Sequence, residues 1–175
     1  MEWISSLFYS LANFLPRLLN LTEDMVCIRM NGSKHKRLKP GYHIYTPLIH
    51  EIRTAYITRQ ELDLPEQILT TKDQQAVLVS ASLVYRVVDP VKALIQTQNY
   101  SDTVIEVAQK SVKSMVTHSD LRDVIVENED FDEEFRSRIM SDIEEYGLEI
   151  DEAFLTSAVA TNPYHVSGLY INMSS

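Results

Sequence analysis

The sequence predicts an α+β fold in which strands come first, helices follow and one strand returns. In the run from Asp73 to Pro90, apolar residues occupy every second position, which is the period of a half-buried strand. The apolar face holds Val77, Val79, Ala81, Leu83, Tyr85 and Val87, and the other face carries Ser80, Ser82 and Arg86. After this strand the apolar spacing changes to three and four residues, which indicates helices. A final alternating run from Leu148 to Ala160 predicts the returning strand.

Length and charge limit the possible functions. A chain of 175 residues forms one domain, with room for a small appendage. Its single Cys27 excludes an intrachain disulfide and a Cys-based metal site. Residues 1–60 carry eight Lys/Arg and four Asp/Glu, a balance of +4, and residues 61–175 carry eight and twenty-one, a balance of −13. This split argues against nucleic-acid binding, which needs a broad basic face, and favours one basic end that meets an anionic surface.

An amphipathic segment covers residues 3–19. Its apolar residues recur at three- and four-residue steps and predict a helix, which Pro16 should kink: Ile4, Leu7, Phe8, Leu11, Phe14, Leu15, Leu18 and Leu19. Glu2 and the lack of a basic residue before Arg17 argue against a signal peptide. Polar interruptions argue against a full membrane span, so an in-plane or re-entrant helix over residues 1–21 fits better. Trp3 and the other aromatic residues favour a membrane interface, although such a stripe could also pack on the domain's own core.

A basic hairpin follows. Met25–Met30 is a short apolar run, and Asn31-Gly32 is a strong signal for a two-residue turn. Lys34, Lys36, Arg37 and Lys39 come next, before a second turn at Pro40-Gly41. Near anionic headgroups each of these cations is worth on the order of 1 kcal/mol, so helix and hairpin together would bind lipid. The alternative is a solvated, Lys-rich turn. His35 and His43 lack the further ligands that a metal site needs.

The sequence therefore predicts a set of membrane-binding residues that combines the apolar stripe with the basic hairpin. The members are Trp3, Ile4, Leu7, Phe8, Leu11, Phe14, Leu15, Leu18, Lys34, Lys36, Arg37 and Lys39.

The remaining elements have clear boundary signals. Residues 49–64 are predicted to be extended, up to Pro65. A helix should begin at Asp89-Pro90 and run to about Gln98, and Ser101 is the predicted N-cap of the next helix. Further along the chain, Ser119-Asp120 predicts a short helical turn through Val124, and Asn128 or Asp130 predicts the start of a longer helix that ends at Gly147. The faces of the two longer helices are Val104, Val107, Ala108, Ser111, Val112 and Met115 in one, and Phe131, Phe135, Ile139, Ile143 and Tyr146 in the other.

No catalytic motif is found. The sequence has no Gly-rich phosphate loop, no Gly-x-Ser-x-Gly elbow and no His-Glu-x-x-His motif. Cys27 falls inside a predicted strand, which indicates a small core residue. We therefore expect neither an enzyme nor a cofactor, metal or catalytic residue.

The order of several motifs resembles the SPFH domain family, which includes stomatin, prohibitin and flotillin and is also called band 7 or PHB. The resemblance covers about residues 22–160. The motifs are Pro40-Gly41-Tyr42-His43-Ile44 with Pro47, Gln67-Ile68-Leu69-Thr70-Thr71-Lys72-Asp73, Val84-Tyr85-Arg86-Val87 with Asp89-Pro90, Leu121-Arg122-Asp123-Val124-Ile125, and Tyr146-Gly147-Leu148-Glu149-Ile150.

The resemblance implies a curved antiparallel sheet with packed helices, an N-terminal membrane anchor and self-assembly into rings or cages, often around a membrane protease or channel. It implies no catalytic residues. The expected domains are an anchor (1–21), an SPFH domain (22–160) and a tail (161–175). Members of the family usually continue into a coiled coil, whereas residues 161–175 contain Pro163 and Gly168 and show no heptads.

These observations favour a non-enzymatic scaffold on the cytoplasmic face of a membrane. We expect it to bind anionic lipid headgroups, and to self-assemble or dock on a membrane protein complex such as a protease. One alternative is a decoy or regulator that joins a host SPFH assembly and inhibits it. The other is a soluble ligand-binding domain in which residues 3–19 cover the core.

Overall fold

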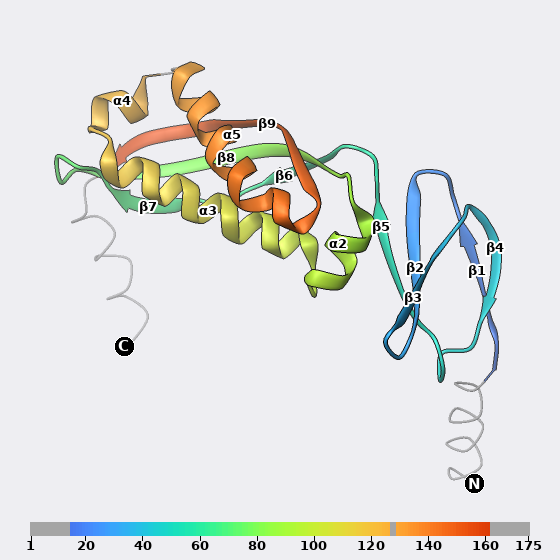
Figure 1. Cartoon of the computed structure of the whole chain (residues 1–175). Helices are drawn as coiled ribbons and strands as arrows, with labels where there is room; N and C mark the ends of the chain where they lie inside the picture. Colours follow the sequence, from blue (N-terminus) through green and yellow to red (C-terminus); the bar gives the residue numbers. More distant parts are fainter. Residues whose placement is uncertain (1–14, 127–128, 162–175) are drawn as a thin grey trace, which may run out of the picture.

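The computed structural model describes residues 15–126 and 129–161, which form a small β part followed by a larger part with a long sheet and helices (Figure 1). The first part holds β1 (Arg17–Leu21), β2 (Met25–Asn31), β3 (Lys34–Leu38), β4 (Gly41–Tyr45) and β5 (Glu51–Tyr56). The second holds strands β6 (Gln60–Asp63), β7 (Gln67–Thr70), β8 (Ala76–Val87) and β9 (Leu148–Thr161). Its helices are α2 (Pro90–Gln96), α3 (Tyr100–His118), α4 (Leu121–Ile125) and α5 (Glu129–Ile143), with a 3₁₀ turn, η1 (Glu144–Tyr146).

Strand β8 is the centre of the larger sheet. It pairs along its length with β9 on one side and with β6 and β7 on the other, and all pairs are antiparallel. Two register shifts, at Ser80/Ala81 and Val84/Tyr85, place bulges that bend the β8–β9 ribbon. All six residues predicted for the inner face of β8 are buried, which confirms the alternation.

Helices α3 and α5 cover the inner face of this sheet (Figure 1). The apolar residues of α5 fall on one side, and Phe135, Ile139 and Ile143 are fully buried. From α3, Val104, Ala108 and Val112 enter the same core. The fold is therefore α+β with antiparallel sheets, as predicted.

The small part contains two sheets, the pair β1–β4 and the three-stranded sheet β3–β2–β5. Leu21, Cys27 and Leu38 form a second, smaller core between them. Ile28 and Ala55 on the other face of β2 and β5 belong to the main core, so the two parts share apolar packing. Arg53 on β5 also donates from Nη1 to the carbonyl oxygens of Leu94 (2.8 Å) and Thr97 (3.4 Å), which lie at the C-terminal end of α2.

Two helix boundaries match the sequence signals and one differs. Asp89 caps α2 by accepting from the backbone N–H groups of Val91 and Lys92, with Pro90 in the first turn. Gly147 takes the left-handed conformation (φ 73°) after η1. Helix α3, however, starts at Tyr100 with Asn99 as its N-cap, and the backbone N–H of Ser101 donates to the Asn99 side chain.

Two predictions near the N-terminus are wrong in detail. Residues 17–21 form strand β1 and not the end of a helix, because pairing with β4 satisfies their backbone and places Leu19 and Leu21 on the small core. The turn between β2 and β3 uses Gly32-Ser33, since Asn31 still pairs with Lys34. Residues 1–14, 127–128 and 162–175 lie outside the described residues, and the predicted helix start at Asn128 falls among them.

Candidate membrane-binding surface

Three segments of the small part meet at one of its ends. Arg17 pairs with Tyr45, Met30 pairs with Glu51, and Asn31 pairs with Lys34 across the turn. The start of β1, the β2–β3 turn and the loop between β4 and β5 therefore lie together, as Figure 1 shows. We call residues 15–18, 31–34 and 44–50 the entry end. The turns at residues 22–24, 39–40 and 57–59 lie at the opposite end.

The entry end exposes apolar side chains. Leu15, Leu18, Ile44, Leu48 and Ile49 are between 55% and 67% exposed. Leu18 and Ile44 are paired residues on the outer face of the β1–β4 sheet, whereas Leu19 faces inward. We call these five residues the apolar cap. A cluster of large exposed apolar side chains at one end of a domain is typical of an interaction surface.

The basic hairpin does not form one patch. Lys34, Lys36 and Arg37 are exposed on β3, and Lys39 is exposed just after it. Because side chains alternate along a strand, Lys34 and Lys36 lie on one face and Arg37 on the other. Lys34 is at the entry end, while Lys39 is at the opposite end, about 16 Å away at about 3.3 Å per residue.

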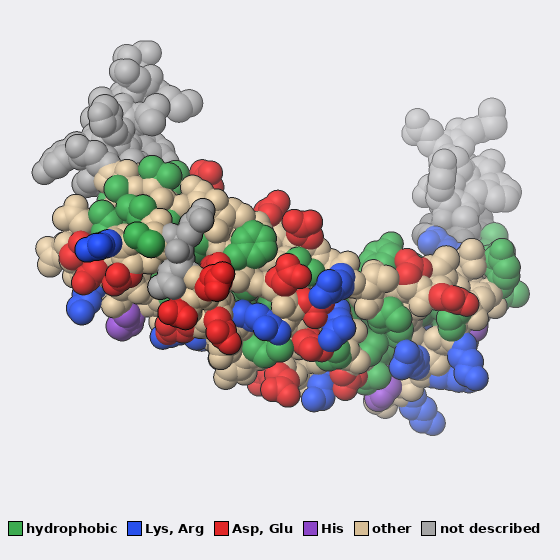
Figure 2. All heavy atoms as spheres, turned by 90° about the horizontal axis from the view of Figure 1, so that it is seen from above, with side chains coloured by type: hydrophobic (Ala, Val, Ile, Leu, Met, Phe, Trp, Pro, Cys, Tyr) green, Lys and Arg blue, Asp and Glu red, His purple; other side chains and the backbone are tan. Residues whose placement is uncertain are grey.

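Charge is nevertheless divided between the two parts of the molecule. Figure 2 shows Lys and Arg side chains beside hydrophobic ones at the end formed by the small part, and most acidic side chains over the helical part. The start of α5 is acidic, with Glu129, Asp130 and Asp132 in its first turn. The basic end and acidic remainder that the sequence predicts are therefore also separated in space.

The structure describes only part of the predicted site. Leu15, Leu18 and Lys34 are exposed at the entry end. Lys36 is also exposed, but it lies further along β3. The other predicted apolar residues lie outside the described residues: Trp3, Ile4, Leu7, Phe8, Leu11 and Phe14. Sequence reasoning missed Ile44, Leu48 and Ile49, and the Leu48-Ile49 pair in a short loop after Pro47 was the available signal. No helix within residues 15–126 and 129–161 has the length and apolar character to cross a membrane.

An ion-pair network joins the two parts on the outer face of the long sheet. Asp151 on β9 is mostly buried, with Arg59 Nε 2.7 Å from its carboxylate and Arg86 Nε 3.6 Å from it. Arg86 also pairs with Glu149 at 3.0 Å. The hydrogen bond that Arg86 donates to the Glu149 carboxylate, aided by the charge of Asp151, raises the pKa of Arg86. Since Arg59 lies in the β5–β6 turn, this network helps to fix the small part on the sheet.

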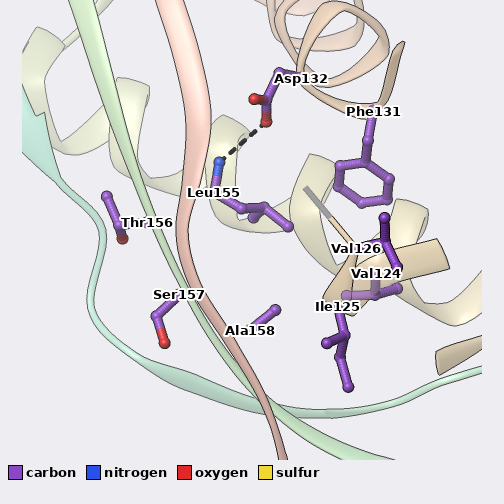
Figure 3. A pocket seen from close by; sticks show the side chains of 9 residues that line it. All are labelled: Val124, Ile125, Val126, Phe131, Asp132, Leu155, Thr156, Ser157 and Ala158. Atoms are coloured by element: carbon purple, nitrogen blue, oxygen red, sulfur yellow. Dashed lines mark hydrogen bonds between the residues drawn. The ribbon is translucent and has the colours of Figure 1, made fainter. Parts of the chain in front are cut away.

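A hollow of about 210 Å³ lies between β9 and the α4–α5 region (Figure 3). Asp132 is the single ionisable residue among the nine that line it, and its carboxylate accepts from the backbone N–H of Leu155 at 3.1 Å. The hollow thus offers no nucleophile with a base beside it. Within the part of the chain that the structure describes, no three His, Cys, Asp or Glu side chains are grouped to hold a metal ion.

Comparison with known proteins identifies the family. The profile of the SPFH domain / Band 7 family matches residues 20–164. An uncharacterised protein of Methanocaldococcus jannaschii is 26% identical over 135 residues, which cover 77% of this chain and 67% of that protein. A stomatin homologue of Pyrococcus horikoshii is 28% identical over 111 residues, 63% of this chain and 42% of the homologue. The human mitochondrial stomatin-like protein 2 is 30% identical over 108 residues, 61% of this chain and 30% of that protein.

The chain therefore belongs to the SPFH domain (Band 7) family, and it is stomatin-like. It spans less than half of the length of the stomatin relatives that it matches.

Proposed function

We propose that this protein is a non-enzymatic scaffold that attaches to an anionic membrane surface through its entry end and self-assembles there. The observation that carries the proposal is the apolar cap, five large side chains exposed where the chain enters from residues 1–14. Family membership supports the same function, since stomatin-like relatives share the domain.

The energetics support attachment by two weak signals acting together. Burying an exposed Leu or Ile side chain in an apolar phase contributes roughly 1.5–3 kcal/mol when burial is complete. The cap residues are already one-third to one-half covered, so each contributes less. Lys34 at the same end adds on the order of 1 kcal/mol near anionic lipid. An apolar surface and adjacent cations are the combination that gives stable peripheral binding.

Residues 1–14 complete the anchor in this proposal, as an in-plane or re-entrant amphipathic segment. Leu15 and Leu18 belong to the same lipid-facing surface, but Leu15 reaches it from the bend just before β1 and Leu18 from β1 itself. With the acidic helical part held in water, the domain of residues 22–160 stands on the cytoplasmic face. There it contacts other copies or a membrane complex such as a protease or channel.

Flotation with phospholipid vesicles tests the proposal. The full chain should float with vesicles that contain an anionic lipid, and less with purely zwitterionic ones. The double variant Leu48→Ser/Ile49→Ser should lose most of this binding. The matched control is Val88→Ser/Val126→Ser, which removes two apolar side chains of the helical part that are 53% and 56% exposed, against 67% and 55% for Leu48 and Ile49. Equal flotation of both double variants would contradict the proposed surface. A chain that stays monomeric and never floats would instead be a soluble ligand-binding domain.

A further inference from the structure

The long sheet has two free edges. Strand β7 pairs with β8 on one side, and β9 pairs with β8 on the opposite side. No described strand pairs with the other side of either β7 or β9. Free edges present unpaired N–H and C=O groups and are templates for pairing with another chain.

Side chains of α5 satisfy only part of the β9 edge. Arg136 Nε donates to the carbonyl oxygen of Ile150 (3.2 Å), and the Asp132 carboxylate accepts from the N–H of Leu155 (3.1 Å). After Leu155 the strand continues with six uncharged residues to Thr161. The β7 edge, Gln67-Ile68-Leu69-Thr70, is uncharged as well. Neither segment carries the Lys or Pro that commonly protects a free edge from pairing.

The grooves beside the two edges carry charges of opposite sign, acidic beside β9 and basic beside β7. A shallow groove of about 370 Å³ runs beside β9 at residues 151–154. Its ionisable lining residues are Asp132, Glu133, Arg136, Asp151 and Glu152, of which Asp132, Arg136 and Asp151 already have partners within the chain. A groove of about 550 Å³ runs beside β7, and its charged lining residue is Lys113 on α3. Glu133 and Lys113 are both exposed.

We propose that the β9 edge of one copy pairs with the β7 edge of the next copy, with Glu133 of the first facing Lys113 of the second. Within one copy β7 and β9 both run antiparallel to β8, so they are parallel to each other. A translated copy therefore presents β7 to β9 in parallel, and the sheet continues from copy to copy. Such a head-to-tail contact closes into a ring when its rotation permits.

This interface rests on the self-assembly in the proposed function and names the surface that mediates it. Four residues of β7 limit the contact to a few hydrogen bonds, so it is weak for free chains. Attachment to one membrane raises the effective concentration of the edges and makes a weak contact sufficient.

Energy transfer between charge-reversal variants bound to vesicles tests the interface. Chains labelled at an introduced Val88→Cys with donor or acceptor dyes should show energy transfer on anionic vesicles. Lys113→Glu and Glu133→Lys should each weaken association roughly tenfold because each places like charges together. A one-to-one mixture of the two variants should restore transfer, since every contact in an alternating chain is again complementary. Circular dichroism confirms that each variant is folded.

A second pair of variants tests the backbone contact itself. Ile68→Lys and Val159→Lys place a charge on each edge strand at exposed positions, and both should abolish transfer. Val88→Lys, labelled instead at an introduced Ile95→Cys on α2, is the matched control and should leave transfer unchanged. Transfer that persists in all edge variants overturns this interface while self-assembly stands. Wild-type chains that bind vesicles without any transfer overturn both.

Discussion

Leu18 in β1 lies directly opposite Ile44 in β4, and both side chains are 67% exposed on the outer face of this two-stranded sheet. The inner face of the same strand carries Leu19 and Leu21, which pack on the small core. One short strand thus separates residues that hold the fold from residues that are free to bind. Because exposed apolar pairs contribute little to folding, their presence at the entry end supports a binding function.

This alternation predicts different stability effects for neighbouring leucines. Leu21→Ala should lower the free energy of unfolding by about 2–5 kcal/mol because it leaves a cavity beside Cys27 and Leu38. Leu18→Ala should change it by less than about 0.5 kcal/mol because the side chain is exposed. Urea unfolding followed by circular dichroism measures both. Similar losses for the two variants would argue against β1 as a strand.

Gly147 is predicted to be irreplaceable. A Cβ at this position would lie 2.6 Å from the carbonyl oxygen of Asp89 and 2.8 Å from its Cβ, and the φ of 73° disfavours other residues. The carbonyl of Gly147 also accepts from the N–H groups of Val88 and Asp89. Gly147→Ala should therefore cost about 2–4 kcal/mol. Thermal unfolding measures this loss. Gly32→Ala is the control, because Gly32 also has a positive φ but an added Cβ there would meet no neighbouring atom, so it reports the cost of the backbone conformation alone.

Asp73 should make stability depend on acidic pH. Its carboxylate accepts from Thr71 Oγ1 (2.5 Å) and from the N–H of Leu121 (3.2 Å), which ties the β7–β8 turn to α4. The Thr71 hydrogen bond first, and then that of Leu121, lower the pKa of Asp73. A carboxyl with a lowered folded-state pKa stabilises the fold above its unfolded pKa of about 3.9, and this stabilisation is lost as the pH falls through the folded value.

The corresponding measurement is the melting temperature of Asp73→Asn and of the wild type from neutral to acidic pH. The difference between the two melting temperatures should be largest above about pH 4 and should shrink as the pH falls below it. Asp120→Asn is the matched control, since Asp120 makes no side-chain capping bond to α4. A difference that stays constant down to the lowest pH would contradict the role of the Asp73 carboxylate.

Arg53 is predicted to hold the two parts of the molecule together. Its guanidinium donates to the carbonyl oxygens of Leu94 and Thr97, where the last turn of α2 has no basic residue of its own. Arg53→Met keeps much of the aliphatic packing and should cost about 1.5–3 kcal/mol through the unpaired carbonyls. Hydrogen exchange should accelerate in α2 and β5 and not in α5. Uniform acceleration would indicate a general loss of stability instead.

The sequence predicts the large sheet and its helices well because their signals are local. The alternation of β8, the Asp89-Pro90 start of α2 and the left-handed Gly147 each follow from a few neighbouring residues. Residues 17–21 fail for the opposite reason. Leucines at positions 15, 18 and 19 fit a helical stripe equally well, and only pairing with the distant β4 makes them a strand.

The candidate site was only partly predictable for the same reason. Leu15, Leu18 and Lys34 could be chosen from apolar and basic patterning, but Ile44, Leu48 and Ile49 join them only through the fold. The same tertiary arrangement moves Lys39 to the far end of β3, although it is close to Lys34 in the sequence.

The central claim is that the entry end inserts into lipid. Depth-dependent fluorescence tests this insertion most directly. A polarity-sensitive dye is placed at Leu48→Cys or, as the control, at Val88→Cys. Cys27 is fully buried and burial raises its pKa, so the native thiol stays unlabelled. On anionic vesicles the dye at position 48 should shift to the blue and be quenched by lipid-borne quenchers, while the dye at position 88 stays aqueous. An aqueous spectrum at position 48 in vesicle-bound protein would contradict the account.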